Sequence, residues 1–319
     1  MIETPLRPRE AVRLDGRRTL FNNPEVVTPG WYVVARSKEV QAGEVRGATL
    51  GEQRVVVYRD AAGTVHGMDA RCPHLGADLR HGTVVGDGIQ CAFHHWCFGP
   101  DGACREAPGL AAVPKRSTRA YPVQERWGFV WLFYGSKPLW ELPEPPNHQR
   151  WRVIRPPSQH IRCHPHLVIA NGLDASHFEA LHGMTFTAPS RLIVEEPYRV
   201  TVTLQGRPNS ARLQRVTGTV ERDIAASFTT IGGNLAWASV ESPVRFHVLF
   251  SGRPSEKGGC HTQTVLFLPR NPGGFFRAFA SMYILLRDDR RILDDIRFFP
   301  GFTERDAPLQ AFANLVNGI

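Results

Sequence analysis

The sequence predicts an α+β protein in which a small all-β unit precedes a larger unit built from an antiparallel sheet and a long C-terminal helix. Three stretches of the 319 residues carry this prediction. Residues 31–134 contain short β-branched and aromatic runs separated by turn signals. Residues 198–269 alternate as sheet strands do, and residues 275–299 repeat apolar side chains at spacings of three and four.

The order of these stretches predicts the domain organisation. We expect an N-terminal segment at residues 1–30, the all-β unit at 31–135, a proline-rich linker at 136–151 and the second unit at 152–319. Strands of the first unit are expected at 31–35, 54–58 and 128–134. A helical stretch is expected to open the second unit at 167–182, before its sheet.

The composition indicates which partners and which cellular compartment to expect for the protein. The formal net charge of +8 is spread along the chain in pairs such as Arg17-Arg18, which excludes a nucleic-acid-binding tail. This charge favours solubility, with steering of an acidic redox partner as the alternative. The longest apolar run, residues 278–286, is too short to cross a bilayer, and no secretory leader is recognisable. We therefore expect a cytoplasmic protein whose six cysteines are reduced.

Two loops of the first unit each pair one cysteine with one histidine, as Cys72-x-His74 and Cys91-x-x-His94. Two thiolates and two imidazoles can bind zinc, but common zinc sites pair cysteine with cysteine and histidine with histidine along the chain. The alternating order suits a Rieske [2Fe–2S] cluster, in which one iron takes both thiolates and the other takes both imidazoles. The remaining cysteines, Cys97, Cys104, Cys163 and Cys260, are interpreted as small buried residues.

A second group of ligand residues opens the second unit. His177 and His182 are five residues apart, about 140° around a helix, so the helix is expected to break between them. Asp174 lies three residues before His177 and is expected to hold its free ring N–H. Two histidines and one carboxylate on one face would make an open iron site.

The carboxylate of this site is expected on the C-terminal helix. Asp289 falls about 60° from Leu286, inside the apolar face, whereas Asp288 points the other way. A carboxylate on a buried face needs a strong partner, which favours Asp289 as the iron ligand. Asp288 stays the main alternative; Asp294, Asp295 and the more local Glu179 are weaker ones.

Both motifs resemble those of Rieske non-heme iron oxygenases. Residues 72–79 and 91–96 resemble the N-terminal domain of that family, with His95 standing where the family usually has glycine. The pattern Asn171-x2-Asp174-x2-His177-x4-His182 resembles its mononuclear-iron motif, and residues 289–293 resemble the segment with its third ligand.

The resemblance implies a helix-grip catalytic domain and a head-to-tail homotrimer in which the cluster of one subunit serves the iron of its neighbour. It implies catalytic roles for Asn171 and Asp174, with Asp174 reaching His94 of the next subunit. It also implies two cofactors, the cluster and a mononuclear Fe(II), with electrons from NAD(P)H through a flavin iron–sulfur reductase, a ferredoxin or both.

The expected activity is oxygenation of a hydrophobic small molecule by hydroxylation, demethylation or desaturation. Residues 164–183 look most like the steroid-active branch, which includes 3-ketosteroid 9α-hydroxylase and cholesterol 7-desaturase. An aromatic O- or N-demethylase and a ring-hydroxylating dioxygenase are alternatives. Other classes are a pure electron-transfer protein, a zinc-binding module and a regulatory relative. The substrate, the reductase and the choice between Asp288 and Asp289 stay open.

Overall fold

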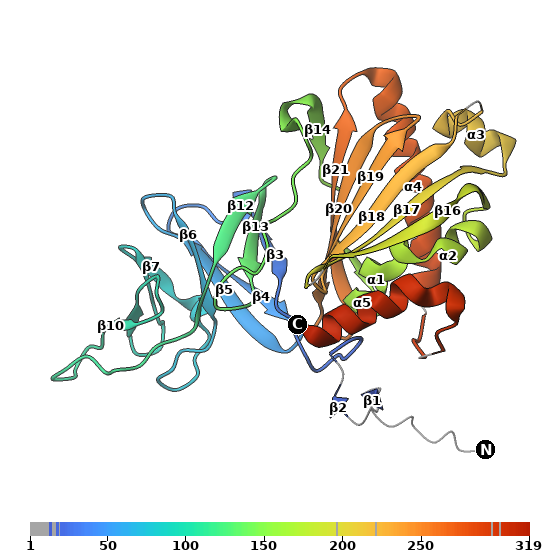
Figure 1. The fold of residues 1–319 in the computed structure, drawn as a ribbon. Helices are drawn as coiled ribbons and strands as arrows, with labels where there is room; N and C mark the ends of the chain where they lie inside the picture. The colour runs from blue at the N-terminus through green and yellow to red at the C-terminus, as the bar shows by residue number, and fades with distance from the viewer. Residues whose placement is uncertain are drawn as a thin grey trace, which may run out of the picture.

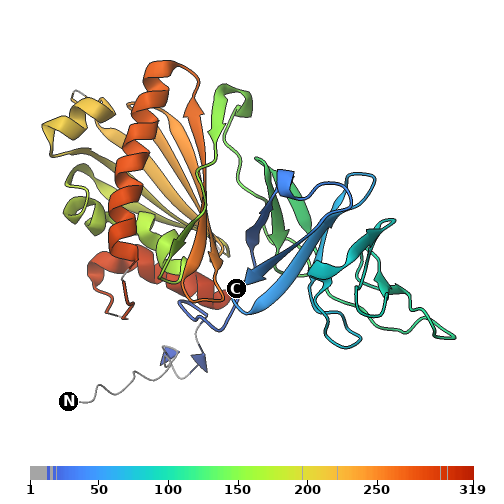
Figure 2. The same cartoon turned by 180° about the vertical axis from the view of Figure 1, so that it is seen from behind.

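Two groups of strands lie side by side in the molecule, as Figure 1 and, from behind, Figure 2 show. The computed structural model describes residues 13–14, 17–18, 20–195, 197–220, 222–294, 296–299 and 301–319. Most of the expected N-terminal segment before residue 20, and the weaker iron-ligand candidate Asp295, lie outside these ranges. In the part described, β1 (Arg13–Leu14) pairs with β2 (Arg17–Arg18).

The first group contains only strands and short 3-10 turns. It forms three small antiparallel sheets with the orders β11-β6-β5-β4, β12-β13-β3 and β10-β9-β8-β7. Val55 to Tyr58 on β5 and all five residues of β13 are buried, which explains why these strands read as continuous apolar runs. The strands are β3 (Trp31–Arg36), β4 (Val45–Leu50), β5 (Gln53–Arg59), β6 (Val65–Asp69), β7 (Thr83–Val85), β8 (Gly88–Gln90), β9 (Cys97–Phe98), β10 (Cys104–Glu106), β11 (Ala120–Tyr121), β12 (Val123–Arg126) and β13 (Phe129–Phe133).

The second group is one antiparallel sheet with the order β14-β21-β20-β19-β18-β17-β16, and β15 also pairs with β21. The alternation predicted at 198–269 corresponds to β17 through β21. β16 was not predicted, because every residue from Pro189 to Glu195 is exposed and no buried face imposes alternation. The strands are β14 (Trp151–Ile154), β15 (Gln159–Ile161), β16 (Met184–Glu195), β17 (Arg199–Pro208), β18 (Ile224–Ile231), β19 (Leu235–Ser242), β20 (Phe246–Pro254) and β21 (Cys260–Pro269).

Five α-helices accompany this sheet within the described ranges, and the long one crosses one of its faces (Figure 2). They are α1 (Pro165–Ala170), α2 (Ala175–Ala180), α3 (Ala211–Thr217), α4 (Pro272–Leu293) and α5 (Ala307–Gly318). The 3-10 turns are η1 (Ser37–Glu39), η2 (Leu79–His81), η3 (His148–Arg150), η4 (Asn171–Leu173) and η5 (Glu304–Asp306).

Helix α4 begins and ends at identifiable signals. The side chain of Asn271 accepts a hydrogen bond from the Gly274 N–H, and Pro272 occupies the first turn. Apolar side chains such as Ala278 and Met282 pack against the sheet. The predicted continuation to residue 299 is wrong, because α4 ends at Leu293. The carboxylate of Asp294, just beyond it, accepts a hydrogen bond from the Arg162 N–H at 3.0 Å, which ties the chain to the end of β15.

The two groups of strands share a hydrophobic core. Trp31 and Trp131 from the first group lie in one hydrophobic cluster with Leu235 and Phe267 from the second, and Trp140 of the proline-rich segment belongs to the same cluster. The Gly51 N–H also donates to the Pro254 carbonyl across the junction at 2.9 Å. The predicted α+β order of an all-β unit followed by a sheet with a long helix is confirmed. No helix in the described ranges is long and apolar enough to cross a membrane.

Candidate metal centres

Two loops of the first unit have matching backbone geometry. The N–H of Gly76 donates to the Cys72 carbonyl at 2.9 Å, and the N–H of His95 donates to the Cys91 carbonyl at 3.0 Å. Gly76 and His95 both have positive φ, +79° and +58°. Each loop therefore turns back on its cysteine at the fourth residue. A positive φ at the position of His95 explains why the resemblance leads one to expect glycine there, since glycine adopts a positive φ without strain.

The four predicted cluster residues meet between these loops. Cys72 and Cys91 are buried, and the rings of His74 and His94 lie 4.6 Å apart between centroids. Burial raises the pKa of the Cys72 thiol, while backbone N–H groups of His74 and Leu75 act against this rise. Nδ1 of His74 is buried without a hydrogen-bond partner in the described residues. A buried imidazole nitrogen left unpaired is what a metal ligand would present.

The arrangement of these four residues bears on the choice between a zinc ion and a [2Fe–2S] cluster. Zinc with bonds of about 2.0 to 2.3 Å would gather all four ligand atoms within about 4 Å of one another. Within the described residues, His177, His182 and Asp289 form a group whose ligand atoms all lie within 4.8 Å of one another. The four cysteine and histidine residues discussed here do not belong to that group. In a [2Fe–2S] cluster the donors are divided between two irons and need not meet at one point, so the arrangement is compatible with the cluster.

Trp96 fixes one of the predicted ligands. Its ring stacks on His74 with centroids 4.3 Å apart and planes 2° apart. Trp96 itself is buried, whereas Leu75 and Phe93 beside the histidines are 67% and 61% exposed. The site therefore combines a held imidazole with an apolar outer rim. No role was predicted for Trp96, although it lies only two residues after His94.

The second predicted site is built from a broken helical segment. Helix α1 runs into the η4 turn, and α2 then begins with Asp174 as its N-cap. Oδ1 of Asp174 accepts from the N–H groups of Ser176 and His177 at 2.9 and 3.2 Å. Helix α2 ends at Ala180, before His182, so the predicted break between the two histidines is confirmed.

The expectation that the Asp174 side chain holds the free ring N–H of His177 is wrong. Nδ1 of His177 donates instead to the backbone carbonyl of Asp174 at 2.7 Å, because the carboxylate is engaged in capping α2. This bond directs Nε2 of His177 into the site. Asn171 places its side-chain amide nitrogen 3.3 Å from the same Nε2.

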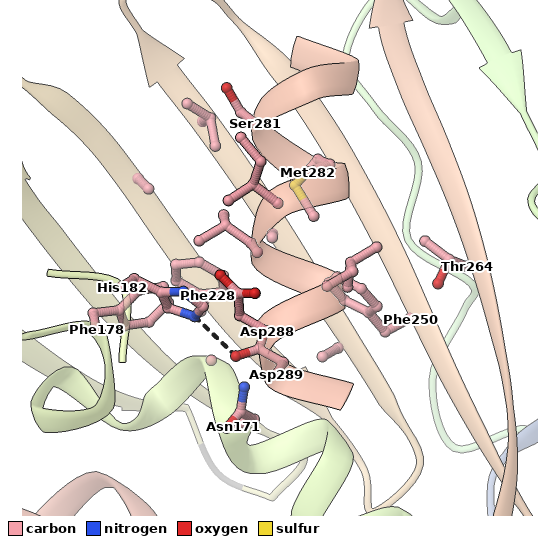
Figure 3. A pocket seen from close by; sticks show the side chains of 18 of the residues that line it. Asn171, Phe178, His182, Phe228, Phe250, Thr264, Ser281, Met282, Asp288 and Asp289 are labelled. Carbon is pink, nitrogen blue, oxygen red and sulfur yellow. Dashed lines mark hydrogen bonds and ion pairs between the residues drawn. The ribbon is translucent and has the colours of Figure 1, made fainter. Parts of the chain in front are cut away.

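His177, His182 and Asp289 converge on one point; Figure 3 shows two of them, His182 and Asp289, facing each other. Nε2 of His182 lies 2.8 Å from Oδ1 of Asp289, and Nε2 of His177 lies 3.5 Å from the same oxygen. Burial acts to raise the pKa of Asp289, but hydrogen bonds from both histidines outweigh it and lower the pKa to about 2. The ligand atoms of the three residues lie within 4.8 Å of one another, which fits one metal ion with open positions.

The alternative carboxylates have other partners. Asp288 forms an ion pair with Arg287 at 2.8 Å, Asp294 accepts from the Arg162 N–H, and Glu179 lies 4.0 Å from Arg305. The geometry thus supports Asp289 over Asp288. His164 caps α1, and Nδ1 of the buried His166 accepts from the Asn22 N–H at 2.9 Å, so both have structural contacts.

His182 and Asp289 of the triad line a cavity between the sheet and α4 (Figure 3). The cavity has a volume of about 260 Å³, and most of its lining is apolar. Phe178, Phe228 and Phe250 surround the end at which His182 and Asp289 lie. These side chains were not predicted individually, because several strands and α4 contribute one face each and only their packing brings them together.

Comparison with known proteins identifies one domain of the chain. Residues 30–121 match the model of the Rieske [2Fe-2S] domain, so the first unit is such a domain. Cholesterol 7-desaturase nvd of Bombyx mori is 36% identical over 184 residues, which are 56% of this chain and 41% of that protein. The 4beta-methylsterol monooxygenase of Methylococcus capsulatus is 32% identical over 163 residues, which are 48% of this chain and 44% of that protein.

The chain thus spans less than half the length of these curated relatives. A solved structure, dicamba monooxygenase bound to dicamba, matches over 90% of this chain and 96% of its own with a TM-score of 0.64 at 18% identity, which shows a shared fold. The predicted kinship with Rieske oxygenases, cholesterol 7-desaturase among them, is confirmed.

Proposed function

We propose that this chain, which carries a Rieske [2Fe–2S] domain and is related to sterol oxygenases, is the oxygenase component of a multi-component oxidoreductase. It would use dioxygen and electrons derived from NAD(P)H to hydroxylate, demethylate or desaturate a hydrophobic, steroid-like molecule. One observation carries the proposal: His177, His182 and Asp289 converge, and two of them, His182 and Asp289, line an apolar cavity.

Each cofactor would have its own set of side chains. Cys72, His74, Cys91 and His94 would hold the cluster, and the triad of His177, His182 and Asp289 would hold Fe(II). When bound, the cluster supplies single electrons and the iron activates dioxygen. The chain's own residues orient these groups: Trp96 holds the His74 ring, and the Asp174 carbonyl holds the His177 ring. Phenylalanines around the triad keep water from it.

The shape of one chain favours electron transfer between chains. The sheet β7–β10, which flanks the Cys91 loop, lies at the end of the molecule remote from α2 and α4 (Figure 1). A head-to-tail homotrimer would bring the cluster of one subunit to the triad of the next, with Asp174 as the bridge to His94 of the neighbour. A flavin iron–sulfur reductase or a ferredoxin would deliver the electrons, in the cytoplasm.

An aromatic O- or N-demethylase is the second candidate. Its support is the shared fold with dicamba monooxygenase, a structure bound to an aromatic acid. The sterol-named relatives are more similar in sequence and favour the steroid-like substrate.

Two measurements test the proposed function. Metal and acid-labile sulfide analysis should give three irons and two sulfides per chain. Zinc without sulfide, or two irons alone, would contradict the assignment as an oxygenase. Oxygen-18 labelling with a panel of steroids and methoxy-aromatics should then place label from dioxygen in a steroid product. Labelled product from the methoxy-aromatics alone would support the second candidate instead.

A further inference from the structure

The cavity extends lengthwise along α4, away from the triad. Asp289 lines the cavity towards the C-terminal end of α4, which we call the inner end. Ser281 and Arg277 line it eight and twelve residues earlier on the same helix, towards the outer end. At 1.5 Å per residue, these positions are about 12 and 18 Å from Asp289 along the helix axis. Figure 3 shows Ser281 and Met282 above Asp289 on this helix. The space suits an elongated occupant that lies parallel to α4.

Small side chains on the sheet make room for such an occupant. Gly206, Ala226 and Ala238 line the cavity on β17, β18 and β19, on the face that α4 crosses. On the helix side, Met282 and Leu285 line the same space. Most of the middle of the cavity therefore offers apolar contact, as the body of a rigid hydrocarbon requires, and the Ser281 hydroxyl there already donates to the Arg277 carbonyl.

Arg277 places a positive charge at the outer end. Its guanidinium lies against Gly218 at the end of α3, where an added Cβ would meet Nη1 at 2.9 Å. In the described part of the chain this guanidinium makes no hydrogen bond or ion pair. The nearby hydroxyls are already donating, from Ser281 to the Arg277 carbonyl at 2.7 Å and from Thr217 to the Leu213 carbonyl at 2.7 Å.

The other charges of the cavity lie at its opposite end. At the inner end Asp288 is paired with Arg287, and Asp289 would be a ligand of the iron. Arg290, also near that end, donates to Gln159 at 3.2 Å. Arg277 is thus the charged side chain of the lining without a partner in the described residues, which favours an anion at the outer end.

From this geometry we infer that the substrate is an elongated apolar acid whose carboxylate binds Arg277 at the outer end of the cavity. The inference rests on the proposed function, because it assigns the substrate class of the same site. A guanidinium accepts a carboxylate through two parallel hydrogen bonds, which makes it a specific anchor for this group. The anchor would also decide which carbon of the skeleton faces the triad.

Binding to the metal-loaded enzyme tests the inference without turnover. The probes are 3-oxochol-4-en-24-oic acid and its methyl ester, which share one skeleton and differ in charge. Calorimetry under anaerobic conditions should show the acid binding to the native enzyme at least about tenfold more tightly than the ester. Arg277→Gln should weaken binding of the acid about tenfold and leave the ester unchanged, and Arg277→Lys should recover part of the loss.

Arg291→Gln is the matched control, because Arg291 is exposed on the same helix and does not line the cavity. Equal affinity for acid and ester would overturn the inference, as would a loss of acid binding in Arg290→Gln with none in Arg277→Gln. The proposed function fails separately, through missing iron or sulfide or through the absence of labelled product. Arg277-dependent binding of the acid without oxygenation would support the inference and contradict the proposed activity.

Discussion

The low pKa of Asp289 results from its contacts with the imidazole rings of His177 and His182. Its oxygen lies 2.8 Å from His182 and 3.5 Å from His177, and these contacts hold its pKa at about 2 although the carboxyl group is largely buried. The neighbouring Asp288 is paired with Arg287 and makes no such contacts in the described residues.

We expect Asp289→Asn to lose the mononuclear iron and keep the cluster, because an amide is a poor iron ligand. Iron content should fall from about three to about two atoms per chain, with the visible spectrum of the cluster unchanged. Asp288→Asn is the control and should retain all the iron. The reverse result would make Asp288 the ligand.

His95 is held in a conformation that glycine adopts more readily. It has φ of +58° in a loop whose counterpart carries Gly76 at +79°. We expect His95→Gly to stabilise the cluster-loaded protein by about 0.5 kcal/mol, since relief of backbone strain exceeds the added freedom of the unfolded chain. Thermal unfolding should give a higher midpoint for His95→Gly and a lower one for Gly76→Ala; a lower midpoint for His95→Gly would mean that the imidazole stabilises its loop.

Helix α1 is the element whose stability should respond most to pH. His166 on α1 is buried against Phe21, and its Nδ1 accepts from the Asn22 N–H. Burial, with a smaller contribution from His164, lowers the pKa of His166 well below the ordinary value of 6.5. The neutral ring thereby joins the N-terminal segment to the second unit of the chain.

Below about pH 6.5 the His166 side chain of the unfolded chain binds a proton, whereas in the folded chain it stays neutral. The free energy of unfolding should therefore be highest above about pH 7 and should decrease as the pH falls. Each pH unit removes up to about 1.4 kcal/mol until the folded group also titrates. Unfolding midpoints at pH 7.5 and 5.5 should differ less in His166→Gln than in the native protein. An equal difference in both proteins would exclude His166 as the cause.

At the scale of elements, sequence periodicity predicted the strands and helices that bury one face. It missed the helix ends that are fixed by tertiary contacts. Strands β17 to β21 and the start of α4 follow from alternation and spacing. The end of α4 follows from a contact between Asp294 and the backbone of Arg162, which no local pattern announces. Helix α5 was also missed, although Phe312, Leu315 and Val316 form an apolar stripe that packs in the core.

The metal sites were easier to predict than the cavity, for a physical reason. Ligand residues such as Cys72, Cys91, His177 and His182 belong to short local motifs, and Asp289 could be chosen because a carboxylate on an apolar face needs a partner. The hydrogen bond from His177 to the Asp174 carbonyl was not foreseeable, because it depends on which group caps α2. The cavity depends on side chains from many strands at once.

At the scale of the whole molecule, the separation of the two metal sites in one chain leads to a complementation test. A Cys91→Ser chain lacks a cluster ligand, and a His177→Ala chain lacks an iron ligand. Each alone should be inactive, and co-assembled chains should regain part of the native activity, because one intact cluster can serve an intact iron site on a neighbour. Mixed assemblies without activity would mean that electrons do not cross between chains.

The core shared by the two units has a consequence for assembly. Trp31 and Trp131 of the Rieske domain share one hydrophobic cluster with Leu235 and Phe267 of the large sheet, so a hinge between the units would expose large apolar surfaces. The angle between the units is therefore a property of the single chain. In a head-to-tail ring that angle sets the curvature, and with it the number of subunits at which the ring closes.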